Sequence, residues 1–207
     1  FAAIAAVDHG GSMAAVAVDL VDCETMFAAK ALLASLGSSL LEGRQTGMDY
    51  DTSSLAAVNF NTTIAGIERA DAILLVGTNL RWEASLVNTR IRKAIKRGAK
   101  VWAIGPETDL TYKANWLGND LAVLGNLPDA LTEAFGKAER PMVIVGGAAL
   151  KGAHGDALKL AETLNLVRDG WNGFNVVHMA ASRMGGLMLG YAQKAGISAL
   201  HDAKLVF

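Results

Sequence analysis

The chain has 207 residues, enough to bury a sizeable core as one domain or as two small lobes. Its 19 basic and 20 acidic residues give a net charge of −1, which excludes the strong cationic field typical of proteins that bind nucleic acid or anionic membranes. A hydrophobic fraction of 52% excludes disorder, and no apolar run approaches the roughly 20 residues of a spanning helix.

In the first half of the chain, short apolar runs alternate with helical patterns. In chain order we predict the end of a helix over 1–7, a strand over 14–20, a helix over 24–36, a strand over 38–41, a short helix capped within 61–63 that ends at Arg69, and a strand over 72–76. We expect the second of these helices to bury Met26, Phe27, Leu33 and Leu36. The strand over 72–76 is apolar throughout, which is typical of a central strand in a parallel sheet.

The second half continues the alternation. We predict a helix over 82–97, a strand over 100–104, a helix over 128–138, a strand over 142–145, a helix with Ala157, Leu158, Ala161 and Leu164 facing inward, a helix over 176–184 ended by Gly185-Gly186, and the start of a strand over 204–207. This order predicts an α/β fold with a doubly wound, mostly parallel sheet of the Rossmann type.

The helix over 82–97 has two distinct sides. We expect Leu86, Val87, Ile91, Ala94 and Ile95 to face inward. Five cations, Arg90, Arg92, Lys93, Lys96 and Arg97, crowd its last turns, where the helix dipole favours positive charge. We interpret this cluster as a solvated face, with a phosphate or an acidic partner as the alternative.

Two segments resemble each other, since 72–79 and 142–149 are each an apolar strand that runs into glycine. Internal duplication produces such a pair, and so do any two βα units. A division into two βα lobes that meet near residues 139–150 is therefore an alternative to a single domain.

The ends of two predicted strands carry the groups best suited to bind a ligand. Gly77, Thr78 and Asn79 follow the strand over 72–76, and Gly105 and Glu107 follow the strand over 100–104. Ligands of open parallel sheets lie at this edge, and an acidic residue there often binds a ribose hydroxyl. Ordinary turns explain both segments equally well. No glycine-rich phosphate loop follows any predicted strand, so we expect no nucleotide site.

The residues that hold metals or form nucleophiles are sparse. Cys23 is the single cysteine, so this segment by itself can form no disulfide, iron–sulfur site or cysteine-rich zinc site. The four histidines (His9, His154, His178 and His201) lack the short spacing that places two imidazoles on one metal. We therefore predict no metal site and no catalytic residue, and we interpret Cys23 as a structural thiol.

The run from Asn59 to Asn79 (NFNTTIAGIERADAILLVGTN), followed by Arg81, Glu83 and the segment 88–93 (NTRIRK), resembles the large iron–sulfur subunit of respiratory complex I, of the alphaproteobacterial and mitochondrial type. The likeness continues through residues 109–112, 116–118, 140–142 and 171–190, and so covers nearly the whole chain.

The resemblance implies that residues 1–207 are a piece of that subunit's molybdopterin-oxidoreductase-like domain. We expect a non-catalytic scaffold in the peripheral arm of NADH:quinone oxidoreductase, with other peripheral-arm subunits as partners. The resemblance implies no cofactor in this segment, and 4Fe-4S and 2Fe-2S clusters upstream in the parent subunit. It also implies a soluble segment at the cytoplasmic face of the bacterial inner membrane, without nucleic acid or direct membrane contact. The alternatives are a fragment of an active molybdopterin-dependent oxidoreductase and a nucleotide-binding βα module.

The chain departs from active molybdopterin enzymes, as the resemblance presents them, at three places. Leu80 and Ser85 replace prolines of the Gly-x-Asn turn, which are also usual in the complex I family, so the shape of this loop is open to question. Gly105-Pro106-Glu107 stands where Asp-Pro-Arg is common, and the molybdenum-ligand loop near Gly43-Arg44-Gln45 has no thiol.

Overall fold

The computed structural model describes residues 2–7, 10–44, 47–48 and 50–207. The chain divides into two compact units. The continuous unit is Ala56–His178, and the discontinuous unit combines Phe1–Leu55 with Met179–Phe207. The expected meeting point near residues 139–150 lies inside the continuous unit, because the strand at 141–145 pairs with a neighbouring strand on each side.

The continuous unit is built on a five-stranded parallel sheet with the order β5-β4-β3-β6-β9. Its strands are β3 (Ala72–Val76), β4 (Lys100–Ile104), β5 (Asn115–Trp116), β6 (Pro141–Val145) and β9 (Phe174–Val176). The chain builds outward from β3 to β5 and then returns to β6 and β9 on the other side, so the sheet is doubly wound, as the sequence predicts.

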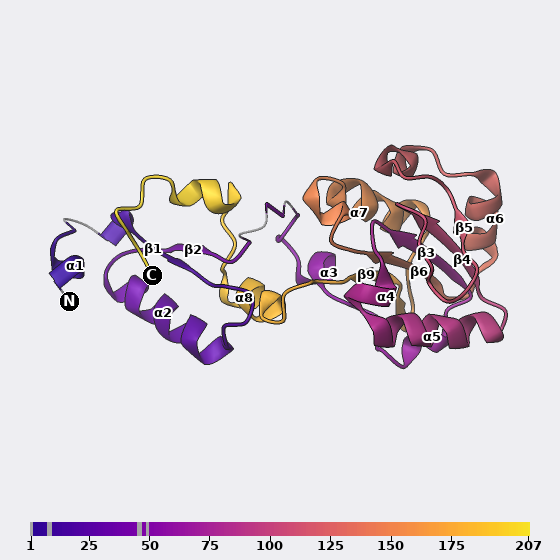
Figure 1. The fold of residues 1–207 in the computed structure, drawn as a ribbon, viewed down its shortest axis with the longest axis horizontal. Coiled ribbons are helices and arrows are strands. Elements are labelled where there is room, and N and C mark those ends of the chain that lie inside the picture. Colours follow the sequence, from indigo (N-terminus) through magenta and orange to yellow (C-terminus); the bar gives the residue numbers. More distant parts are fainter. Residues whose placement is uncertain (1, 8–9, 45–46, 49) are drawn as a thin grey trace. The chain divides into compact units, whose positions relative to one another are not determined.

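Short helices and one small ribbon complete this unit. The helical segments are α3 (Leu55–Val58) at its boundary, η2 (Gly66–Arg69), α4 (Leu80–Glu83), α5 (Ser85–Lys96), η3 (Leu121–Gly125), α6 (Asp129–Lys137), η4 (Ala149–Lys151) and α7 (His154–Thr163). Strands β7 (Val167–Arg168) and β8 (Trp171–Asn172) form an antiparallel pair. Helix α5 covers one face of the sheet, and α6 and α7 cover the other (Figure 1).

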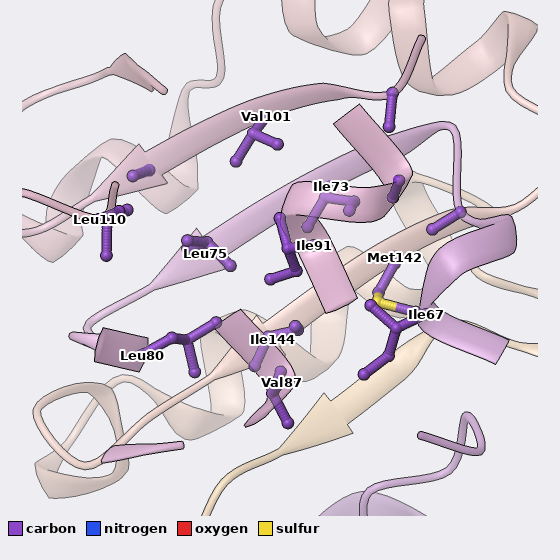
Figure 2. Close-up of a cluster of buried hydrophobic side chains, with 14 of the residues drawn as sticks. Ile67, Ile73, Leu75, Leu80, Val87, Ile91, Val101, Leu110, Met142 and Ile144 are labelled. Carbon is purple, nitrogen blue, oxygen red and sulfur yellow. The ribbon is translucent and has the colours of Figure 1, made fainter. Parts of the chain in front are cut away.

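The core under α5 is a layer of aliphatic side chains. Figure 2 shows Val87 and Ile91 of α5 directed at alternate residues of the sheet, Ile73, Leu75 and Ile144. All five are buried. On the opposite face Trp102 packs on Phe135 of α6, with ring centroids 5.9 Å apart. Burial on both faces explains why β3 and β6 are apolar at every position.

The discontinuous unit has a three-stranded parallel sheet with the order β10-β1-β2. Its elements are α1 (Ala2–Ala5), η1 (Gly10–Ser12), β1 (Met13–Val16), α2 (Cys23–Ser35), β2 (Leu40–Glu42), α8 (Arg183–Leu189), η5 (Gly196–Leu200) and β10 (Leu205–Val206). Met26, Leu33 and Tyr191 fill its core, and the Tyr191 hydroxyl donates to the Met26 carbonyl at 2.7 Å.

Three expectations about the helices are wrong. Phe27 and Leu86, expected to face inward, are exposed. The predicted helix over 176–184 is replaced by the end of β9, a loop and α8. The pair Gly185-Gly186 lies inside α8, because a side chain at Gly185 would come within 2.5 Å of the Cys23 sulfur on α2. These glycines therefore let two helices pack closely instead of ending one.

Candidate functional site

The candidate site lies at the carboxyl ends of β3, β4 and β6. Gly77, Thr78 and Asn79 follow β3, Gly105 follows β4, and Gly146-Gly147 follows β6. The chain leaves β3 toward β4 and later returns to β6 on the opposite side, which makes the gap between β3 and β6 the usual ligand position of such a sheet.

Gly77 brings these loops together by its own backbone. Its N–H donates to Ile104 at 2.8 Å, and its carbonyl accepts from Ala148 at 3.1 Å. Its φ is +57°, and a Cβ added here would lie 2.6 Å from the nitrogen of Ala149. The close approach that this glycine permits is therefore to the protein's own backbone.

Gly146 makes a second close contact across the same gap. A Cβ at this position would lie 2.3 Å from the Cβ of Thr78 and 2.7 Å from Oε2 of Glu83. The space beside Gly146 is thus already occupied by two side chains of the chain itself.

Glu83 joins the loops that follow β3 and β6. Its Oε1 accepts the backbone N–H of Asn79 at 2.7 Å, and its Oε2 accepts that of Gly147 at 3.2 Å. Backbone N–H groups at this edge commonly bind the anionic groups of ligands. Here they are donated to a carboxylate of the protein.

Helix α4 also contacts the loop after β4. Nη1 of Arg81 donates to Oδ2 of Asp109 at 2.6 Å and to its carbonyl at 3.2 Å. Leu80, the residue before Arg81, is completely buried in the core. Helix α4 therefore covers the carboxyl edge of β3 and is held there by Leu80, Arg81 and Glu83.

Four of the five predicted crevice residues meet at this edge. Gly77, Thr78 and Asn79 form one loop, and a Cβ at Gly105 would be 3.8 Å from the Cα of Gly77. Glu107 is exposed. Of the two interpretations of this segment, a ribose-binding carboxylate and an ordinary turn, neither is tested, and both stay predictions.

Three oxygen atoms in the loops after β3 and β4 are buried without a hydrogen-bond partner among the described residues: Oγ1 of Thr78, Oδ1 of Asn79 and Oγ1 of Thr108. An unpaired buried polar atom costs about 1–3 kcal/mol, so these atoms are suited to ordered water or a small polar ligand. The residues do not fit a phosphate-bearing pterin such as molybdopterin, because the Glu83 carboxylate would repel its phosphate and already accepts the available N–H groups.

The loop after β2, expected to correspond to the molybdenum-ligand loop, lies in the discontinuous unit. Glu42 is fully buried there, and Arg44 binds it through Nε–Oε1 and Nη2–Oε2, each 2.9 Å. Gly43 and Gln193 also donate their backbone N–H groups to this carboxylate, at 2.9 and 2.8 Å. Gln45 lies outside the described residues.

Glu42 also has a perturbed pKa. Burial raises it, but the hydrogen bonds from Arg44 and Gln193 together outweigh burial and hold the pKa below its ordinary value. A cavity of about 280 Å³ adjoins Arg44, and its described lining residues are Arg44, Gly47, Met48 and 194–198. None of these lining residues is a cysteine.

The remaining candidates for chemistry belong to other segments of the sequence. Cys23 is exposed at the start of α2. The buried His154 and the half-buried His178 donate from Nε2 to the carbonyls of Ala57 and Val58, at 2.7 and 2.6 Å. His201 is exposed, and His9 lies outside the described residues. Among the described residues, no three His, Cys, Asp or Glu side chains are grouped so that they could hold a metal ion.

The residues that close the crevice were not predicted from the sequence. Arg81 and Glu83 were noted only as residues that match the family, and Gly146 only as the glycine at the end of a predicted strand. The spacing of Glu83, four residues after Asn79, was an available signal, because a side chain there can reach back to the first N–H of a helix turn.

Within the described part of the chain, no helix is long and apolar enough to cross a membrane.

A family model described as molybdopterin oxidoreductase matches residues 2–207. The NADH-quinone oxidoreductase G subunits of Rickettsia typhi and Rickettsia prowazekii are each 40% identical over 188 residues, which is 86% of this chain and 28% of theirs. The mitochondrial NADH dehydrogenase [ubiquinone] iron-sulfur protein 1 of Solanum tuberosum is 35% identical over 201 residues, 93% of this chain and 27% of its own length.

This chain thus spans under a third of the length of the relatives it matches. The match to the family model extends over nearly all of its residues, through both compact units. The chain belongs to the molybdopterin oxidoreductase family.

Proposed function

We propose that this chain is a non-catalytic scaffold domain of NADH:quinone oxidoreductase, the enzyme that passes electrons from NADH to quinone. The names of the relatives support membership in that enzyme. In this proposal the chain lies in the peripheral arm, on the cytoplasmic side of a bacterial inner membrane, and reaches the membrane only through other subunits. The iron–sulfur clusters belong to other parts of the parent protein, and this chain holds no cofactor.

The observation that carries the scaffold role is the closure of the β3–β6 edge by Glu83. A catalytic site needs open space and groups directed into it. Here the carboxylate of Glu83 takes up the N–H groups of Asn79 and Gly147, and Thr78 fills the space beside Gly146. At this edge the side chains of Glu83 and Arg81 bind the loops that follow β3, β6 and β4, and so are not free to act on a substrate.

Exposed apolar side chains provide surfaces for subunit contacts. On the discontinuous unit these include Leu20, Phe27, Met179 and Met188, each more than 60% exposed. A neighbouring subunit that covers such side chains removes their apolar surface from water, which stabilises the contact. They suit a chain that contributes shape and contacts to an assembly.

Purification of the tagged parent protein from its native membranes tests the proposal. We expect NADH:quinone oxidoreductase activity to co-purify with it, and molybdenum and tungsten, measured by inductively coupled plasma mass spectrometry, to be far below one atom per chain. Stoichiometric molybdenum or tungsten would contradict the scaffold role. Recovery without that activity would contradict membership in the enzyme.

Substitutions inside the crevice separate scaffold from catalyst. Thr108→Val removes a hydroxyl that has no hydrogen-bond partner among the described residues and keeps the side-chain volume, so electron transfer per assembled complex should equal wild type. Glu107→Gln, at an exposed position of the same loop, is the matched control. A large loss of turnover for Thr108→Val, with assembly intact, would indicate that the crevice takes part in the reaction.

A further inference from the structure

On the surface of the continuous unit formed by α4 and α5, the cationic side chains outnumber the carboxylates that pair with them. Arg90, Lys93 and Arg97 all contact a single carboxylate, Glu68, with Lys93 Nζ at 3.2 Å and Arg97 Nη2 at 3.3 Å. The other two cations of the helix end, Arg92 and Lys96, form no ion pair with any described residue. Three of the five cations therefore share one carboxylate, and the other two have no ionic partner among the described residues.

The helix dipole explains only part of this accumulation. It stabilises a cation near the last turn, and the effect ends within that turn. Several of these cations are also spaced three or four residues apart, such as Arg92 with Lys96 and Lys93 with Arg97, and each like-charge pair at this spacing is destabilising. The hydrogen bonds from Arg90 and then Lys93 hold the pKa of Glu68 below its ordinary value, which keeps this carboxylate ionised, but one such charge cannot balance five cations.

The same surface continues into two large apolar side chains. Leu86, Arg90, Lys93 and Arg97 are spaced by four, three and four residues, so they lie along one face of α5. Leu86 is 77% exposed, and Trp82 on α4, four residues before it, is 81% exposed. Tryptophan is strongly enriched among the residues that dominate binding energy at protein interfaces.

The turn that carries Trp82 is held in position before any partner arrives. Its neighbours Leu80, Arg81 and Glu83 are anchored in the core, on Asp109 and on Gly147 respectively. An aromatic side chain on an immobilised turn loses little conformational entropy on binding, which favours affinity.

We infer that the surface formed by Trp82, Leu86 and the five cations of α5 is a docking site for an acidic segment of another polypeptide that also presents an apolar side chain. The inference rests on the proposed function, because it places the parent protein in an assembly. Carboxylates of the partner would face Arg92 and Lys96, and its apolar side chain would cover Trp82 and Leu86.

A membrane surface fits these observations less well. An interfacial helix inserts a broad apolar face into the lipid. The apolar face of α5, with Val87, Ile91 and Ala94, is buried against the sheet, so only Trp82 and Leu86 remain for lipid. An acidic polypeptide uses both the charge and the small apolar area.

Chemical modification of lysines in the native assembly tests the inference. The purified assembly is treated with a water-soluble carbodiimide, which joins an amine to a carboxylate in direct contact, and separately with an amine-acetylating N-hydroxysuccinimide ester. We expect Lys93 or Lys96 to be joined to an Asp or Glu of another polypeptide, and both lysines to be acetylated several-fold less than Lys113, an exposed lysine of the same unit.

The outcomes separate this inference from the proposed function. Lys93 and Lys96 acetylated as fully as Lys113 in an active assembly would overturn the docking site and leave the scaffold role intact. Links confined to the same polypeptide, Glu68 included, would also overturn it, as would protection that disappears when lipid is removed. An assembly that lacks NADH:quinone oxidoreductase activity contradicts the proposed function, while the modification pattern still decides the docking site.

Charge reversal provides an independent arm. Arg92→Glu with Lys96→Glu should restore full acetylation of Lys93 and lower recovery of the cross-linked partner, and Trp82→Ala should act in the same direction. Lys113→Glu with Lys151→Glu makes the same change in net charge at other exposed positions of the unit and should leave both readouts at wild type.

Discussion

Oε2 of Glu83 lies 3.2 Å from the backbone nitrogen of Gly147, and this hydrogen bond ties α4 to the loop that follows β6. Replacing Glu83 by Ala leaves the N–H groups of Asn79 and Gly147 without their acceptor. We expect Glu83→Ala to lower the free energy of unfolding by about 1–3 kcal/mol, as measured by urea denaturation. Glu83→Gln keeps one acceptor oxygen and should lose less. Glu107→Ala, an exposed carboxylate beside the same edge, should stay within about 0.5 kcal/mol of wild type.

Gly146 should tolerate no side chain. The Cβ of an alanine would overlap the Cβ of Thr78, so Gly146→Ala should destabilise the chain by about 1–3 kcal/mol or more. Gly136 lies in α6 with nothing within 4 Å of a built Cβ, and Gly136→Ala should stabilise by about 0.5–1 kcal/mol. Thermal unfolding of both variants checks the contrast. Equal effects of the two substitutions would mean that the β3–β6 edge is looser than described.

Ser85→Pro should be tolerated. Ser85 is the first residue of α5, and proline suits this position because the N–H there has no acceptor within the helix. Ala84 before it is already non-helical, with φ −155° and ψ 72°. We expect stability equal to wild type or up to about 1 kcal/mol higher.

Thr89→Pro, at an exposed position inside the same helix, should cost about 3 kcal/mol or more. The melting temperatures of the two proline variants provide the comparison. A strong loss of stability for Ser85→Pro would show that α5 does not begin at Ser85.

Acid should weaken the discontinuous unit through Glu42. Its pKa in the folded chain lies below the ordinary value, so the unfolded chain binds the proton more readily. The stabilisation is fully present above the ordinary glutamate pKa of about 4.3 and is lost as pH falls through the lower, folded value. Glu42→Gln should therefore be less stable near pH 7 and should show a flatter decline in acid. Urea midpoints between pH 7 and pH 3 measure this difference, with the exposed Glu24→Gln as the matched change of charge.

The central strands could be predicted from the sequence because burial on both faces requires an apolar residue at every position. The predicted bounds of 72–76 and 100–104 equal those of β3 and β4. The inward faces of the helices were harder to predict. Helix α2 is rich in alanine and apolar almost all round, so its periodicity does not distinguish buried Met26 from exposed Phe27.

The positions of Gly77, Thr78 and Asn79 at the edge of the sheet also followed from the sequence, because strand ends in a parallel sheet share one edge. The closure of that edge did not. It depends on Glu83 meeting Gly147, which lies 64 residues further along the chain, and no local pattern specifies such a contact. Leu80 and Ser85, which replace prolines, were expected to disturb the shape of their loop. Each begins a helix instead, and the first position of a helix is one that proline also favours.

The two ends of the continuous unit are fastened together. Val176 donates its N–H to the carbonyl of Asn59 at 3.0 Å, and His178 donates to that of Val58. During synthesis this unit can close as soon as its own residues have emerged, whereas β1 cannot pair with β10 until Leu205 and Val206 are made. Synthesis thus imposes an order of events, in which β1 and β2 emerge first, the continuous unit can close next, and the three-stranded sheet is completed only when β10 arrives.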